Sequence, residues 1–157
     1  MRPAPTSPRS EIRHAGLIAR RLCGHWSGVL VEGPSGAGKS DLGLRAIAAG
    51  FRLVADDRTV IFASADRLYG CAPRPLAGLL EARGVGILHM AHLPVAEIIL
   101  WLSLTERPDG IERLPDLALR SLMGVKVPHL SCYAQEPSAT AKLDMALRHL
   151  GGRLRKA

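Results

Sequence analysis

Short apolar runs separated by glycine, proline and polar residues recur along the chain, and most of them predict strands. The runs that we expect to form strands are residues 15–19, 29–31, 53–55, 60–63, 67–71, 97–104 and 125–133, with Pro128 limiting the last. Ser64, Ala65 and Asp66 separate two of these runs at a distance typical of a hairpin. A buried sheet is therefore the expected centre of the fold.

Helical spacing is found at two places. Leu42, Leu44, Ile47 and Ala48 recur at roughly helical intervals, and Gly50 is placed to cap that helix. Residues 138–150 predict an amphipathic helix that ends at a glycine pair. Its apolar face comprises Leu143, Ala146, Leu147 and Leu150, and the glycine pair is Gly151 and Gly152.

Three further segments complete the prediction. We expect a helical turn at residues 76–82, a loop at 105–116 and a short helix at 117–123. Strands mixed with helices indicate an α/β fold with a mixed sheet flanked by helices. No repeat or internal linker divides the chain. We therefore expect a disordered lead at residues 1–10, one domain at 11–151 and a basic tail at 152–157.

The charge of the chain gathers at its two ends. The formal net charge is +7, but residues 1–21 and 142–157 each carry five basic side chains against one acidic. The remaining 120 residues hold 11 basic and 12 acidic side chains, so the body is nearly neutral. Aromatic residues make up only 4% of the chain, too few for a surface that stacks nucleobases. A nucleic-acid partner is therefore not expected.

The cysteines and the hydropathy exclude several other classes of protein. The three cysteines are widely spaced and form no CxxC pair, which argues against a disulfide framework or a zinc site. No apolar stretch reaches 18 residues, so we expect no membrane span, and the first residues lack the apolar core of a secretory signal. These features predict a cytoplasmic location.

The most specific motif is a glycine-rich loop between a predicted strand and a predicted helix. It matches G-x-x-x-x-G-K-[ST], and its residues are Gly33, Pro34, Ser35, Gly36, Ala37, Gly38, Lys39 and Ser40. Glycines let backbone N–H groups converge on an anion, and the start of the helix adds positive potential. We expect the loop to bind ATP, with Lys39 on the phosphates and Ser40 on Mg²⁺.

Two adjacent carboxylates follow the next predicted strand. Asp56 and Asp57 come directly after residues 53–55, where a strand is expected to return beside the phosphates. Because side chains alternate along a strand, one carboxylate can face Mg²⁺ and the other a substrate hydroxyl. The alternative is a solvated turn, in which aspartate is common.

Together these segments resemble the HPr kinase/phosphorylase family, whose members phosphorylate a serine of the phosphocarrier protein HPr. The run GPSGAGKSDLGLRAIAAGFRLVADDRTVI resembles the family's phosphate loop and the acidic segment after it. LLEARGVGI at residues 79–87 is similar to a second family signature. His14 stands upstream of the loop, where the family has an active-site histidine. The resemblance implies a P-loop kinase domain with the nucleotide-binding fold of HPr kinase and phosphoenolpyruvate carboxykinase.

The resemblance also implies roles for individual residues. Asp57 would accept the serine proton, and His14 and Arg113 would act beside it together with Lys39. Ser40 and Glu81 would hold Mg²⁺, and Asp56 would assist them. Without the resemblance, Glu81 and Arg83 have a simpler interpretation as an ion pair at a helix end. A homo-oligomer, a hexamer in the family, is expected as well.

The chain departs from longer family members in two places. Those members carry an N-terminal domain, whereas the phosphate loop here begins at Gly33, so we expect the short form found in some proteobacteria. Residues 125–131 also lack the basic, glycine-containing loop that supports dephosphorylation in long members. The reverse phosphorolysis is therefore left open. A P-loop small-molecule kinase and a non-catalytic nucleotide-binding regulator remain as alternative functions.

Overall fold

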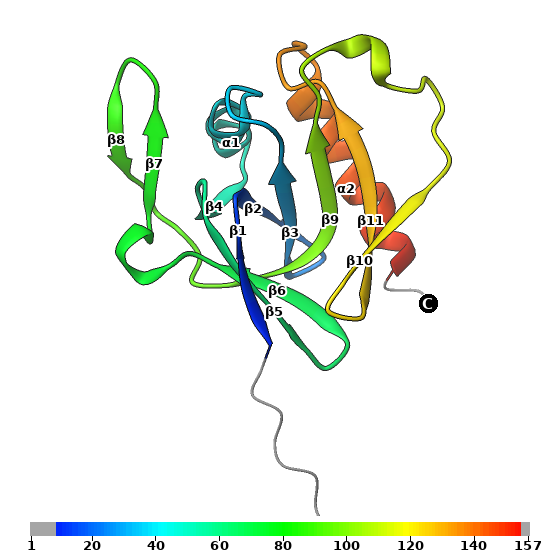
Figure 1. Cartoon of the computed structure of the whole chain (residues 1–157), viewed down its shortest axis with the longest axis horizontal. Coiled ribbons are helices and arrows are strands. Elements are labelled where there is room, and N and C mark those ends of the chain that lie inside the picture. Colours follow the sequence, from blue (N-terminus) through cyan, green and yellow to red (C-terminus); the bar gives the residue numbers. More distant parts are fainter. Residues whose placement is uncertain (1–8, 155–157) are drawn as a thin grey trace, which may run out of the picture.

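The computed structural model describes residues 9–154, in which nine strands form one mixed sheet and two helices pack against it (Figure 1). The sheet strands are β1 (Ser10–Arg13), β2 (Ala15–Leu22), β3 (His25–Glu32), β4 (Arg52–Ala55), β5 (Thr59–Ser64), β6 (Arg67–Cys71), β9 (Ala96–Leu104), β10 (Ala118–Leu122) and β11 (Val125–Cys132). The helices are α1 (Lys39–Ala48) and α2 (Ala139–Leu154). Two further strands, β7 (Leu79–Ala82) and β8 (Gly86–His89), pair as a separate hairpin beside α1 (Figure 1). Single turns of 3₁₀ helix lie at Arg74–Leu76 and Pro108–Gly110.

Three neighbouring strands of the sheet run parallel, and their carboxyl ends create the functional edge. β9 pairs in parallel with β3 on one side and with β11 on the other. The remaining neighbours are antiparallel, including the β2–β3, β2–β4, β5–β6 and β10–β11 pairs. Because loops after parallel strands leave from the same edge, the glycine-rich loop after β3 lies at the edge from which the loop after β9 also departs.

Each face of the sheet has its own apolar core. Both helices cover one face, where Leu42 of α1 and Leu143 and Leu147 of α2 pack against β3 and β9. On the other face the sheet curls, so that Ile61 of β5 and Leu68 of β6 share a cluster with β2 and β4. Burial of these side chains supplies the main driving force for folding and fixes the strand that carries the loop.

The α/β class and the mixed sheet are confirmed, as are all seven predicted strands and both longer helices. Gly50, at a φ of 104°, ends α1 as expected, since Phe51 N–H donates to the Ala46 carbonyl and Gly50 N–H to the Ile47 carbonyl. The hairpin around residues 64–66 and the loop at 105–116 are also found.

Three local predictions are wrong. The helical turn expected at 76–82 gives way to strand β7, because Leu80 and Ala82 alternate with exposed Glu81 and pair with β8. The short helix expected at 117–123 is strand β10, which a tight turn at Met123 and Gly124, both with positive φ, folds back along β11. Helix α2 runs to Leu154 rather than ending at the glycine pair. Residues 1–8 of the predicted disordered lead and residues 155–157 of the predicted basic tail lie outside the described residues.

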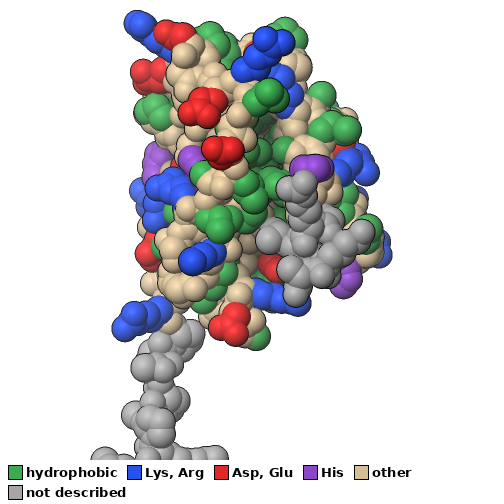
Figure 2. Space-filling model, turned by 90° about the vertical axis from the view of Figure 1, so that its right-hand side faces the viewer, with side chains coloured by type: hydrophobic (Ala, Val, Ile, Leu, Met, Phe, Trp, Pro, Cys, Tyr) green, Lys and Arg blue, Asp and Glu red, His purple; other side chains and the backbone are tan. Residues whose placement is uncertain are grey.

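One face of the molecule carries side chains of both charges (Figure 2). On the face that bears β10, β11 and α2, acidic and basic side chains are interspersed with apolar ones (Figure 2). Within residues 9–154, no helix has the length and apolar character needed to cross a membrane. The three cysteines are free thiols.

Candidate functional site

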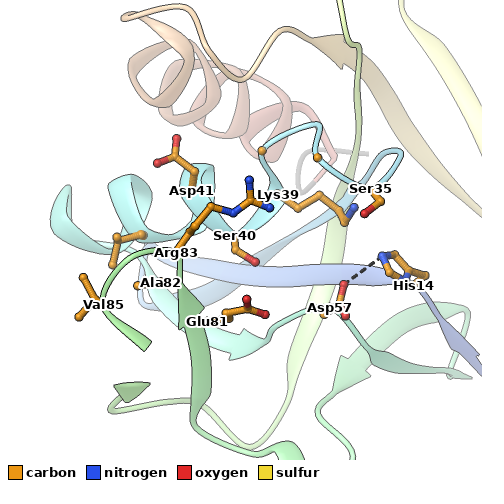
Figure 3. A pocket seen from close by; sticks show the side chains of 13 residues that line it. His14, Ser35, Lys39, Ser40, Asp41, Asp57, Glu81, Ala82, Arg83 and Val85 are labelled. Carbon is orange, nitrogen blue, oxygen red and sulfur yellow. Dashed lines mark ion pairs between the residues drawn. The ribbon is translucent and has the colours of Figure 1, made fainter. Parts of the chain in front are cut away.

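The glycine-rich loop joins β3 to α1 and forms one wall of an open pocket of about 550 Å³ (Figure 3). Gly36 and Gly38 adopt positive φ values of 82° and 94°, the backbone conformation with which glycine-rich loops form anion-binding sites. No side chain caps the first turn of α1, so its N–H groups remain available for an anion. The loop therefore has the conformation that phosphate binding needs.

Gly33 is the point at which the loop packs most tightly against the sheet. A Cβ atom at this position would lie 2.9 Å from Cβ of Leu104 and 3.3 Å from Cβ of Ala37. Such distances are shorter than carbon atoms tolerate without movement, so the close approach requires glycine. The start of the loop is thereby fixed against the carboxyl end of β9.

Lys39 folds back over the loop from the first residue of α1. Its Nζ donates to the Gly33 carbonyl at 2.8 Å and to the Pro34 carbonyl at 3.2 Å. The amino group is therefore held at the mouth of the pocket, where a bound phosphate would replace backbone carbonyls as its acceptor. Gly33, Pro34 and Ala37 belong to the loop without lining the pocket.

Ser40, Asp56 and Glu81 meet on the opposite side of the helix start. The Ser40 hydroxyl donates to Oδ1 of Asp56 at 2.8 Å, and the Glu81 backbone N–H donates to Oδ2 at 3.0 Å. The Glu81 side chain lines the pocket beside Ser40 (Figure 3). Among the described residues, no group of three or more His, Cys, Asp or Glu side chains could bind a metal by itself.

These oxygen donors nevertheless fit Mg²⁺. Magnesium usually binds through one or two carboxylates and completes its shell with water and substrate phosphates. A hydroxyl in contact with a carboxylate beside a phosphate loop meets that requirement. The donor set therefore matches a metal that arrives with a nucleotide rather than one held by protein alone.

His14 and Asp57 lie together on the right-hand side of the pocket in Figure 3. His14 Nε2 is 2.9 Å from Asp57 Oδ1, and both side chains are more than half exposed, at 59% and 58%. Asp57 has a φ of 65°, a left-handed conformation that aspartate tolerates better than most residues. This turn directs the Asp57 side chain toward His14, while Asp56 faces Ser40.

The structure thus brings most of the sequence-predicted residues together and leaves one apart. His14, Lys39, Ser40, Asp57 and Glu81 line a single pocket. Arg113 does not line it and lies exposed in the loop between β9 and β10. The role implied for Arg113 therefore requires that loop to approach the pocket.

Sequence reasoning missed several pocket residues. Asp41 and Leu44 follow the loop on α1, and Val85 and Arg83 come from the β7–β8 turn. Arg83 extends from this turn toward Lys39 and Ser40 (Figure 3). It lies at the end of a strand and not at a helix end, so the simpler interpretation of Glu81 and Arg83 does not fit their location. The signature at residues 79–87 contained the signal for Arg83.

The family model and the similar proteins found by comparison all point to the same family. A family model described as the HPr Serine kinase C-terminal domain matches residues 13–143. The HPr kinase/phosphorylase of Limosilactobacillus reuteri is 39% identical over 115 residues, which cover 66% of this chain and 36% of the relative. That of Xylella fastidiosa is 38% identical over 115 residues, covering 64% and 36%. The chain therefore spans little more than a third of these relatives.

The fold is similar to a solved structure as well. The structure of the Hpr(Ser) kinase/phosphatase from Coxiella burnetii matches with a TM-score of 0.73 and 25% sequence identity. The match covers 93% of this chain and 92% of that chain.

Proposed function

The chain belongs to the HPr serine kinase family, and from this membership we propose that it is an ATP- and Mg²⁺-dependent kinase that phosphorylates a serine of the phosphocarrier protein HPr. The family resemblance predicted from the sequence motifs is confirmed. The observation that carries the proposed activity is that Lys39, Ser40 and Asp57 open into one pocket. The phosphate loop, which would bind ATP, and Asp57, which would accept the serine proton, therefore face the same space.

The proposed reaction needs little covalent chemistry from the protein. Asp57 accepts the proton of the serine hydroxyl, the serine oxygen bonds to the γ-phosphorus, and the bond from that phosphorus to the β,γ-bridging oxygen breaks, leaving ADP. His14 holds the Asp57 carboxylate in place through their 2.9 Å contact. Lys39 and the loop N–H groups stabilise the negative charge of the transferred group.

Ser40, Asp56 and Glu81 are the residues that would hold Mg²⁺. When bound, the metal neutralises negative charge on the nucleotide phosphates. The Ser40–Asp56 contact supports this assignment, because it places hydroxyl and carboxylate oxygens together beside the loop.

The proposal is tested by transfer of labelled γ-phosphate from ATP to HPr, with HPr whose acceptor serine is changed to alanine as the control. Nucleotide binding is measured in parallel. Label on HPr but not on the control supports the proposal. ATP binding without transfer overturns it. Formation of ADP from ATP when a small metabolite replaces HPr as the acceptor would favour a small-molecule kinase.

Two further properties belong to the same proposal. A homo-oligomer is expected, with the hexamer of the family as the specific case, and sedimentation velocity measures it. Because HPr is the proposed substrate, the proposed location is the cytoplasm. Pyrophosphate release from phosphorylated HPr and inorganic phosphate would show that the reverse reaction is retained.

A further inference from the structure

Glu32, the last residue of β3, is the centre of a charged cluster behind the phosphate loop. Its Oε1 accepts a 2.6 Å hydrogen bond from Nε of Arg13, and its Oε2 accepts a 2.7 Å bond from Nε1 of Trp101. Arg120 of β10 lies 3.6 Å from Oε2. The guanidinium carbons of Arg13 and Arg120 lie 4.9 and 4.1 Å from the centroid of the Trp101 ring. We refer to these four residues as the Glu32 cluster.

Two residues of the Glu32 cluster are direct neighbours in sequence of residues in the candidate site. Glu32 directly precedes Gly33, the first residue of the phosphate loop, and Arg13 directly precedes His14. The Arg13–Glu32 hydrogen bond therefore joins the residues next to the two components that must cooperate in phosphoryl transfer.

We propose that Glu32 is a positioning residue, which acts through Arg13 to hold His14 against Asp57 at a fixed place relative to the phosphate loop. This inference rests on the proposed kinase function, in which His14 and Asp57 act on the serine hydroxyl. Glu32 is not among the residues that line the pocket, so its effect is indirect.

His14 lies at the bend of the chain between β1 and β2. β1 ends at Arg13 and pairs with β5, whereas β2 begins at Ala15 and pairs with β3. His14 lies in the bend between them, where neither hydrogen-bonded ladder includes it. A side-chain bond from Arg13 to β3 spans this bend and fixes its orientation.

The cluster is rigid enough for such a role. Trp101 is only 2% exposed, and the Glu32 side chain is 18% exposed, so each of its oxygens is held by a donor with little competition from water. Glu11 binds the other side of Arg13 at 2.8 Å. Burial opposes the charge of Arg13, but the hydrogen bonds that its guanidinium donates to Glu32 and Glu11 outweigh this effect and raise its pKa.

The chain offers a matched control for a purely structural effect. Glu97 lies near the start of β9, its side chain is 27% exposed, and it pairs with Arg67 at 3.5 Å. It resembles Glu32 in burial and in its arginine partner but lies at the opposite end of the sheet's parallel strands. Glu97→Gln therefore reports what the loss of a half-buried glutamate charge does far from the pocket.

The kinetic test compares Glu32→Gln with Glu97→Gln in transfer to HPr. We expect Glu32→Gln to lower kcat about tenfold or more with the KM for ATP changed less than about twofold, because misplacement affects the chemical step. We expect no further loss when Glu32→Gln is added to His14→Ala, since both act through one group. A kcat near that of the wild type, an equal loss in Glu97→Gln, or additive losses would overturn the proposal.

A second measurement does not depend on transfer. The ring signals of His14 in a ¹H–¹⁵N NMR spectrum are identified by their loss in His14→Ala, and Asp57→Asn gives their position without the Asp57 carboxylate. We expect Glu32→Gln to shift these signals toward the Asp57→Asn position and Glu97→Gln to leave them unchanged. Unshifted signals in Glu32→Gln overturn the inference. Absence of transfer by the wild-type protein would instead refute the proposed function. The NMR comparison would still show whether Glu32 positions His14.

If Glu32→Gln does not fold, Arg13→Lys takes its place. Lysine retains the positive charge but has no Nε donor to the Glu32 carboxylate, so the same loss of kcat and the same NMR shift are expected. Wild-type kinetics and wild-type His14 signals in Arg13→Lys would overturn the proposal.

Discussion

The Ser40 hydroxyl donates a 2.8 Å hydrogen bond to Oδ1 of Asp56 and so joins the first turn of α1 to the end of β4. The second oxygen of this carboxylate accepts a hydrogen bond from the Glu81 backbone at 3.0 Å. Three segments of the chain thus converge on one aspartate next to the phosphate loop. The convergence places these oxygen atoms together beside the loop.

Ser40→Ala is expected to weaken nucleotide binding only when Mg²⁺ is present. The loss of the hydroxyl removes a proposed metal ligand but no phosphate contact, so ATP affinity should fall about tenfold with Mg²⁺ and change less than about twofold in EDTA. Isothermal titration calorimetry measures both, with Ser40→Thr as the control that retains the hydroxyl. An equal loss in both buffers would contradict the metal role.

Asp57→Asn is expected to reduce transfer to HPr by about 100-fold or more while ATP affinity changes less than about twofold, because a proton acceptor acts mainly on the chemical step. Labelled-phosphate transfer and calorimetry measure the two quantities. The control is Asp66→Asn, since Asp66 also has a left-handed backbone, with a φ of 59°, but lies in the β5–β6 turn. Retained transfer in Asp57→Asn would remove Asp57 from the mechanism.

The sequence predicts those parts of the fold and site that depend on neighbouring residues. The glycine-rich loop, its strand and its helix are all local, and the loop motif specifies the order in which they follow. Asp56 and Asp57 could be placed near the loop because a strand after a P-loop helix returns beside it. What no pattern showed is that the left-handed backbone at Asp57 separates the directions of the two side chains.

Features that depend on distant segments could not be predicted in this way. The segments that form β7 and β10 are short, and an apolar run of that length suits a helical turn or a strand until its partner is known. The Glu32 cluster joins four strands that lie up to 107 residues apart in the chain, from Arg13 to Arg120. No sequence spacing records such a contact.

Gly33→Ala is expected to destabilise the fold by about 1–3 kcal/mol and to weaken ATP binding, because the added methyl group meets Leu104 at 2.9 Å. Gly43→Ala is the matched control. Gly43 lies in α1, and a Cβ atom added there would meet no atom of another segment within 4 Å, so alanine should raise stability by about 0.5–1 kcal/mol through its helix propensity. Urea unfolding measures both changes, and a neutral Gly33→Ala would contradict the tight packing of the loop.

His129 is expected to make stability depend on pH. Burial, and then the charge of Arg120, lower the pKa of His129 below its ordinary value of 6.5, although Glu32 opposes them. Between the folded-state pKa and about pH 6.5, the unfolded chain therefore binds more protons than the folded chain. The contribution of His129 to the free energy of unfolding is fully present above about pH 6.5. It is lost as the pH falls from there through the folded-state pKa. The Ser103 hydroxyl, 2.8 Å from His129 Nε2, faces the ring.

Urea midpoints at about pH 8 and about pH 5.5 measure this dependence. When the pH falls from about 8 to about 5.5, the urea midpoint of His129→Gln should fall less than that of the wild type. His89 lies in the exposed strand β8, and the midpoint of His89→Gln should fall as much as that of the wild type. An unchanged dependence in His129→Gln would assign the effect to other groups.

Arg83 and Arg113 are expected to act at different stages of the proposed reaction. Arg83 lines the pocket and extends toward Lys39 and Ser40, so Arg83→Ala should lower both ATP affinity and transfer, each by about tenfold or more. Arg113 lies outside the pocket, and it can contribute only when its loop approaches the bound substrates. Arg113→Ala should therefore lower transfer while ATP affinity measured without HPr stays within about twofold of the wild type. Unchanged transfer in Arg113→Ala would remove this residue from the mechanism, and unchanged affinity in Arg83→Ala would show that its guanidinium does not contact the phosphates.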